Sequence, residues 1–182
     1  MEFEDLGTRH IDQLRALCGG CVYWEFPAVF DKSVPADKAR LMKTKWVCCN
    51  TGAFPVGRVA VSGGEPIGFI QFGPPELYPR RLEYDCGPVG DDVLFIACLF
   101  VVPGSRGSGV ARRLLGQAGE VARSLGCAAL ETFARRGSSN NPSGPVELYE
   151  ACGFRVVRDG SEFPLVRLDV AGGGCSSAVP PN

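Results

Sequence analysis

VVPGSRGSGVARRLL (residues 101–115) joins an apolar segment to a helical one through a loop that holds Pro103 and three glycines. The run before it, DVLFIACLFVV (92–102), predicts a strand buried on both faces in the middle of a sheet. After the loop, apolar residues recur at helical spacing over 110–125, and Gly126 is expected to end the helix. A helix start of this kind exposes unpaired backbone N–H groups at the positive end of a dipole, so it predicts a phosphate site.

Two familiar nucleotide-binding patterns do not match this loop. A P-loop needs a lysine and a hydroxyl residue after its last glycine, but Gly109 is followed by Val110 and Ala111. A dinucleotide fingerprint needs a third glycine where Arg112 stands. The remaining pattern, Arg106-x-x-Gly109-x-Ala111, predicts a cradle of backbone amides. A glycine-rich turn without a ligand stays an alternative on this loop alone.

Strand-like and helix-like stretches alternate along the rest of the chain. The N-terminus predicts a short strand and then a surface helix that Thr8 caps and that carries His10, and a second helix is expected over 35–46. The clearest hairpin joins 56–61 to 67–72 around the turn residues 62–65. Further strands are expected over 127–134, 154–159 and 163–170, with a short helix after Pro145, and residues 74–91 predict a long functional loop. This order predicts an α/β (α+β) fold with helices flanking a mixed sheet.

Length and charge limit the function classes. The 182 residues suit one domain, which we place at 1–170, and residues 171–182 predict a flexible tail. A net charge of -1 gives no footprint for nucleic acid. No apolar run is long enough for a membrane span, and the acidic N-terminus is unlike a signal peptide, which favours a cytoplasmic protein. The expected partner is a small-molecule or peptide amine, and a homodimer is compatible with these features.

Nine cysteines are many for such a chain, but most are interpreted as small buried apolar residues. The C-x-x-C of Cys18 and Cys21, with the pair Cys48 and Cys49, could supply four thiolates to zinc. Neighbouring cysteines rarely both ligate one tetrahedral metal, and a zinc ribbon would need a second C-x-x-C. We therefore expect no metal site and keep a zinc-binding module as a third alternative.

LFVVPGSRGSGVARRLL (99–115) resembles motif A of the GNAT N-acyltransferase superfamily, in which Q/R-x-x-G-x-G/A follows a strand ending V-x-P. ELYEACGF (147–154) resembles the L-Y-E-x-x-G-F of motif B in the same family. The two motifs stand in the expected order. The resemblance implies a mixed, mostly antiparallel central sheet of about seven strands flanked by helices. It also implies an N-acetyltransferase that uses acetyl-CoA as cosubstrate.

Positions matched to the family motifs suggest roles for individual residues. The family sheet splays at the strand before motif A, often through a bulge, and the pantetheine arm pairs there with the strand. The asparagine that the family often carries before motif B falls on Pro142, so that contact is shifted to Asn141 or lost. The residues that the resemblance assigns to the cofactor are Leu99, Phe100, Val101, Arg106, Gly107, Ser108, Gly109, Val110, Ala111, Arg112 and Asn141.

The chemistry asks for three groups. A neutral amine attacks a thioester carbonyl, so the site needs an N–H for the oxyanion, an acid for the thiolate and a route for the amine proton. By resemblance, the N–H near Leu99 is the oxyanion donor and Tyr149 the general acid, a task that suits a phenol with a reference pKa of about 10. Tyr149 could instead be an ordinary amphipathic helix residue. Glu131 matches the base of some relatives, with Glu83, Asp85, Asp92 or a water chain as competitors.

The acceptor is expected to contact the first helices and the 74–91 segment, which carry unusual numbers of aromatic residues. Core packing explains such aromatics equally well. Carboxylates nearby, at Glu25, Glu83 and Asp85, could attract a cationic amine. The pocket residues expected are Tyr23, Trp24, Glu25, Glu83 and Tyr84. The sequence thus predicts an N-acetyltransferase acting on a primary amine by direct attack, with a non-catalytic acyl-CoA-binding regulator as the alternative.

Overall fold

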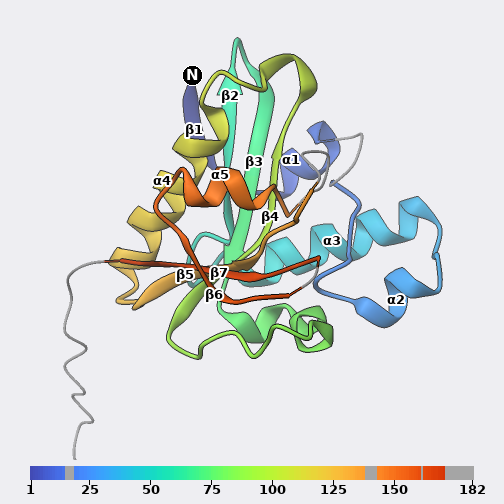
Figure 1. Cartoon of the computed structure of the whole chain (residues 1–182). Helices are drawn as coiled ribbons and strands as arrows, with labels where there is room; N and C mark the ends of the chain where they lie inside the picture. Colours follow the sequence, from blue (N-terminus) through green and yellow to red (C-terminus); the bar gives the residue numbers. More distant parts are fainter. Residues whose placement is uncertain (15–18, 138–142, 161, 171–182) are drawn as a thin grey trace, which may run out of the picture.

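Seven strands form one mixed sheet in the computed structural model, which describes residues 1–14, 19–137, 143–160 and 162–170 (Figure 1). The strands are β1 (Glu2–Asp5), β2 (Gly57–Ser62), β3 (Glu65–Gly73), β4 (Val93–Val101), β5 (Ala129–Phe133), β6 (Arg155–Arg158) and β7 (Leu165–Asp169). Their spatial order is β1-β2-β3-β4-β5-β7-β6. Only β4 and β5 are parallel neighbours. The predicted mixed, mostly antiparallel sheet is confirmed.

Helices cover both faces of this sheet. They are α1 (Thr8–Gln13), α2 (Pro27–Asp31), α3 (Ala36–Asn50), α4 (Val110–Ser124) and α5 (Val146–Glu150). The apolar stripe of α4 packs on β2, β3, β4 and β5, and α5 closes the same core. On the other face, α1 packs on α3 and β3. The sheet therefore lies between two layers of helices.

Several expectations from the sequence are met, and others are corrected. The hairpin is confirmed, with Ser62 paired to Glu65 across a two-residue turn. His10 was expected on the surface, and this is wrong, because its side chain is buried. There its Nδ1 accepts the Gly7 N–H at 3.0 Å, and its Nε2 lies 2.9 Å from a Glu4 carboxylate oxygen. Helix α2 was not predicted, and the long loop contains the 3-10 turns Pro75–Leu77 and Pro79–Glu83. The segment 171–182 lies outside the described residues, so the predicted tail and the boundary at 170 stay predictions.

β4 and β5 pair over a short distance and then part. Their register covers only Val93–Phe95 against Ala129–Glu131. Just beyond it, the Thr132 hydroxyl donates to the Ile96 carbonyl at 2.7 Å, which replaces the next backbone bond. Figure 1 shows the result: β2, β3 and β4 run together, whereas β5, β7 and β6 cross below them. The separation leaves one edge of β4 without a strand partner.

A β-bulge reshapes β4 at the same place. Gln71 pairs with Cys98 and Phe72 with Ile96, so Ala97 has no opposite residue on β3. Ile96 and Leu99 then belong to the core beneath α4, whereas Ala97 and Cys98 belong to clusters on the other face. Two consecutive side chains on one face are the signature of an inserted residue. The bulge therefore turns the second half of β4 away from β5, as the resemblance implies.

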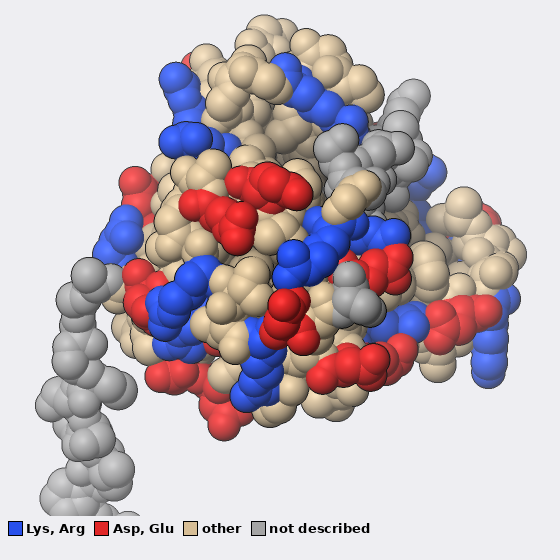
Figure 2. Space-filling model, viewed as in Figure 1, with Lys and Arg blue, Asp and Glu red and all other residues tan. Residues whose placement is uncertain are grey.

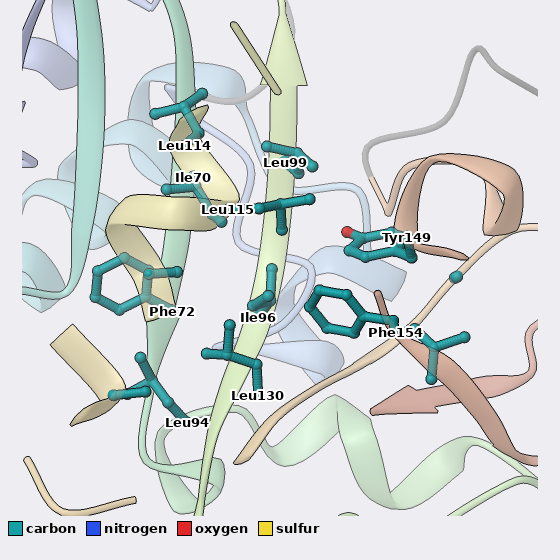
Figure 3. Close-up of a cluster of buried hydrophobic side chains, with 14 of the residues drawn as sticks. Ile70, Phe72, Leu94, Ile96, Leu99, Leu114, Leu115, Leu130, Tyr149 and Phe154 are labelled. Atoms are coloured by element: carbon teal, nitrogen blue, oxygen red, sulfur yellow. The ribbon is translucent and has the colours of Figure 1, made fainter. Parts of the chain in front are cut away.

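The main core lies between the sheet and α4 and includes the fully buried Tyr149 (Figure 3). On the face seen in Figure 2, acidic and basic side chains are interspersed, and neither sign forms a continuous patch. Within the described residues, no helix combines the length and apolar character needed to cross a bilayer.

Candidate active site

The loop between β4 and α4 presents a row of exposed backbone amides. Gly107 and Gly109 have φ angles of +76° and +81°, a region that L side chains rarely adopt. Ser108 fixes the loop through its hydroxyl, which donates to the Ser105 carbonyl at 2.6 Å. Among the described residues, the amides of 107–109 donate to no backbone carbonyl, and the first amides of α4 have no partner in their own helix. This geometry suits a pyrophosphate.

Gly109 offers a direct test of this cradle. Gly109→Ala is expected to cost about 1–2 kcal/mol in the left-handed conformation, because the new Cβ meets no neighbour and only backbone strain is added. If the loop relaxes, the amides turn away and the affinity for CoA falls about tenfold by calorimetry. Gly116→Ala, on the exposed side of α4, is the matched control: it should gain about 0.5–1 kcal/mol and leave CoA affinity unchanged. Equal affinities in both variants would contradict the cradle.

The free edge of β4 continues from this loop. The Val102 N–H donates to the Ile67 carbonyl at 3.0 Å, which fixes the residues whose backbone points toward β3. By alternation, the backbone groups of Leu99 and Val101 point the other way, into the gap left by β5. Arg106 Nε already reaches the Val101 carbonyl at 3.1 Å. An extended ligand arm could therefore pair with β4 as an added strand.

Tyr149 lies on α5 at the opposite side of the gap. Its hydroxyl donates to the Ser143 carbonyl at 2.8 Å, and its ring packs edge-to-face on Phe154 at 5.1 Å. A Cβ at Gly144 would lie 3.2 Å from the ring, so the backbone must approach closely there. Figure 3 shows the hydroxyl end of Tyr149 directed toward β4. Burial raises the pKa of Tyr149 above its usual value, so the phenol keeps its proton at neutral pH.

An apolar pocket of about 240 Å³ reaches this position from the side of α2. Tyr23, Trp24 and Tyr84 line it, as predicted from the sequence. Cys98, from the bulge, and Ser143, which holds Tyr149, also line it. The remaining lining residues were not predicted; they are Cys21, Phe30 and Phe163.

Comparisons with known proteins agree with this geometry. The model of the Acetyltransferase (GNAT) family matches residues 21–154. The chain belongs to the GNAT acetyltransferases. Its cosubstrate is acetyl-CoA, and the loop amides and free β4 edge fit that molecule. No curated protein sequence matches it.

Solved structures share the fold of this GNAT domain at low sequence identity. PaiA N-acetyltransferase from Thermoplasma acidophilum, in complex with coenzyme A, is 16% identical with a TM-score of 0.64 over 92% of this chain and 98% of that one. YncA from Salmonella typhimurium, with its cofactor acetyl-CoA, is 16% identical with a TM-score of 0.60 over 98% of each chain. Ribosomal-protein-alanine N-acetyltransferase from Brucella melitensis is 16% identical, with a TM-score of 0.59 over 93% and 99%.

Glu131 lies on the face of the sheet opposite to Tyr149 in this GNAT domain. Its Oε2 accepts the Gly90 N–H at 2.9 Å, and its Oε1 accepts Arg167 Nη1 at 2.8 Å. Its neighbour Leu130 belongs to the core that contains Tyr149, so alternation turns Glu131 away from it. The structure does not bring the two together, and the base role of Glu131 stays a prediction.

Glu131→Gln tests that role. Since both carboxylate oxygens are engaged, we expect kcat to change less than about threefold while unfolding free energy falls by about 1–3 kcal/mol. Asp169→Asn, which removes the more exposed partner of Arg167 and also its pair with Arg155, is the control and should lower stability less than Glu131→Gln. A loss of kcat of a hundredfold or more in the folded Gln variant, with no loss of stability, would restore Glu131 as the base.

Glu25 does not line the apolar pocket. It forms a buried ion pair with Lys43, whose Nζ also donates to Gln71 Oε1 at 2.7 Å. Gln71 Nε2 donates to the same Glu25 oxygen. Only 1% of the Glu25 side chain and 5% of the Lys43 side chain are exposed. Its charge is thus balanced inside the protein, not offered to an incoming amine.

Other predicted residues fall elsewhere. Glu83 lines an adjacent outer pocket and pairs with Arg80 at 2.7 Å. Asn141 and Cys18 lie outside the described residues. Cys48 and Cys49 are exposed on α3, and the described residues contain no cluster of three or more His, Cys, Asp or Glu able to hold a metal ion.

Proposed function

We propose that this GNAT domain transfers the acetyl group of acetyl-CoA to a primary amine of a small molecule or peptide, with Tyr149 as general acid. One observation carries the proposal: the apolar pocket is lined both by Cys98, at the bulge of β4, and by Ser143, the hydrogen-bond partner of Tyr149. The carbonyl of Ser143 accepts the hydrogen bond of Tyr149, so the phenol contacts a residue of the pocket lining directly. An amine in the pocket would therefore reach the β4 edge beside a proton donor.

Binding is assigned to backbone groups. The amides of 106–112 hold the pyrophosphate of CoA at the start of α4. The free edge of β4 at Leu99, Phe100 and Val101 orients the pantetheine arm. A contact from Asn141 stays a prediction. The bound cosubstrate supplies the acetyl group as a thioester.

The residues around the gap then divide the chemistry. The Leu99 N–H donates to the carbonyl oxygen as negative charge develops, a role that its direction into the gap supports. The amine lone pair forms the C–N bond, the C–S bond breaks, and Tyr149 donates its hydroxyl proton to the leaving sulfur. The proton that the nitrogen loses passes to solvent, from which the phenol is reprotonated. The apolar lining of the pocket keeps bulk water away from the thioester during the attack.

We further propose the cytoplasm as the compartment. No disulfide joins any of the seven described cysteines, a pattern typical of a reducing environment. The homodimer that the sequence leaves open also stays a prediction.

The test is direct. Purified protein is incubated with acetyl-CoA and a panel of amines, and products are identified by mass spectrometry while CoA binding is measured separately. We expect at least one primary amine to be acetylated at a rate proportional to enzyme concentration. Saturable CoA binding without any product from a broad panel would instead support the alternative, a non-catalytic acyl-CoA-binding regulator.

A further inference from the structure

The size of the apolar pocket limits the part of the acceptor that it encloses. Its volume is about 240 Å³, and in the proposed function the reacting nitrogen stands beside Cys98 and Ser143, which belong to its lining. A cavity of about 150 Å³ lined by apolar side chains is enough to bind benzene. The pocket therefore has room for one aromatic ring and an arm of two or three atoms.

The pocket walls consist of rings that hold one another in place. Trp24 lies nearly parallel to Tyr84, with ring centroids 5.3 Å apart and an interplanar angle of 16°. Tyr23 meets Trp24 at 90°, and Phe163 meets Tyr84 at 84°. These preformed faces and edges match a flat ring, which can stack or pack edge-to-face on them. A flexible linear chain would lose more conformational entropy on entering the same space.

The described lining of the apolar pocket contains no charged side chain that could pair with a second charge on the substrate. The hydroxyls of Tyr23 and Tyr84 are hydrogen-bonded to each other at 3.0 Å. Burial raises the pKa of the Cys21 thiol, so it is neutral. An ionised substituent other than the reacting amine would therefore be buried without compensation.

The outer pocket, of about 290 Å³, disfavours carboxylates for a different reason. It shares Tyr23, Tyr84 and Phe163 with the apolar pocket, so the two pockets adjoin each other. Its cation, Arg80, is engaged by Asp31 at 2.6 Å and by Glu83 at 2.7 Å, and it lies over the ring of Tyr23. Glu83 is thus paired, and Glu162 is paired with Arg135. The described lining of the outer pocket still holds three carboxylates against one cation, and this excess attracts a cationic amine and repels an anionic substrate. The described carboxylates lining it are Glu83, Asp85 and Glu162.

We infer that the acceptor is an arylalkylamine, a primary amine on a short uncharged arm that ends in a single aromatic ring and bears no carboxylate. This inference rests on the proposed function and names the substrate class of the same site.

A matched set of probes tests this class. 2-Phenylethylamine is compared with phenylalanine, which adds a carboxylate to the same skeleton, with hexylamine, which lacks the ring, and with 1,5-diaminopentane, which adds a second charge. We expect kcat/KM for 2-phenylethylamine to exceed that of hexylamine about tenfold. It should exceed those of phenylalanine and the diamine about a hundredfold or more. A preference for the diamine, for hexylamine or for phenylalanine would overturn the inference.

Phe30→Ala separates binding from chemistry. Phe30 lines the pocket, yet 43% of it is exposed, so truncation should spare the fold. We expect KM for 2-phenylethylamine to rise about tenfold with kcat nearly unchanged. Leu82→Ala, on a residue that is 71% exposed and lines neither pocket, should leave both constants unchanged. An unchanged KM in Phe30→Ala would count against the assignment.

Direct titration distinguishes this inference from the proposed function. 2-Phenylethylamine is titrated calorimetrically into the protein saturated with CoA, and again into the Phe30→Ala variant. Saturable binding that the variant weakens, with no acetylation of any amine, would overturn the proposed function and leave the pocket assignment standing. Absence of binding would overturn the pocket assignment, whatever other amines are acetylated.

Discussion

Replacing Tyr149 with phenylalanine is expected to lower kcat for amine acetylation by about 10²–10⁴-fold, the range typical of losing a general acid. The affinity for CoA should stay within about threefold, because the cradle is formed by backbone amides at the start of α4 and not by the side chain of Tyr149. The expected loss of kcat follows because the buried phenol of Tyr149 keeps its proton at neutral pH and can donate it. Burial raises the pKa of Tyr149, and its hydroxyl is fixed by the Ser143 carbonyl, so the variant removes a positioned donor. Steady-state kinetics and calorimetry measure the two effects.

Loss of one buried hydrogen bond also has a structural cost, and the control must account for it. The Ser143 carbonyl loses its donor in Tyr149→Phe, which is worth about 1 kcal/mol. Tyr78→Phe deletes the same atom from another fully buried ring, outside the proposed chemistry. The Tyr78 hydroxyl has no hydrogen-bond partner among the described residues, so Tyr78→Phe should be at least as stable as the unsubstituted protein. This variant should also keep its turnover, whereas Tyr149→Phe should lose turnover. Equal kcat in the two variants would remove Tyr149 from the mechanism.

Local patterns predicted the features that depend on neighbouring residues. The hairpin, the strand before motif A and the start of α4 follow from spacing of two or four residues, and the structure has them all. The bulge in β4 could not be predicted from periodicity, because a strand buried on both faces is apolar at every position. Inserting Ala97 therefore leaves no trace in the hydrophobic pattern of the strand.

The candidate site likewise combines features that short motifs predict with features that only the folded chain reveals. The cradle and Tyr149 lie within short motifs, so their positions could be inferred. The pocket is assembled from Tyr23, Phe30, Tyr84 and Phe163, which are far apart in the sequence, and only the general richness in aromatics indicated part of it. Glu25 was expected to face the substrate because its partners are distant: Lys43 is 18 residues away and Gln71 is 46. Long-range pairing decides whether a carboxylate is available, and spacing does not reveal it.

The buried ion pair of Glu25 and Lys43 gives the second large predicted effect, a loss of stability. Lys43→Met is expected to lower the free energy of unfolding by about 3–5 kcal/mol, the cost of leaving one buried charge unpaired. Glu25 Oε2 already has no hydrogen-bond partner among the described residues, so without Lys43 only Gln71 would still donate to the carboxylate. Urea denaturation at neutral pH measures the loss. Lys45→Met, on the same helix but exposed, is the matched control and should change stability by no more than about 0.5 kcal/mol.

The double variant Glu25→Gln with Lys43→Met decides whether charge is the cause. Removing both charges eliminates the unpaired carboxylate, so stability should recover by at least half of the loss seen in Lys43→Met, a coupling that a double-mutant cycle measures. If the side-chain volume of Lys43 were what mattered, the second substitution would add to the first loss instead. Methionine keeps most of the apolar length of lysine, so Lys43→Met leaves little cavity and its loss of stability reports mainly the lost charge. A Lys43→Met variant as stable as Lys45→Met would show that the pair contributes nothing to folding.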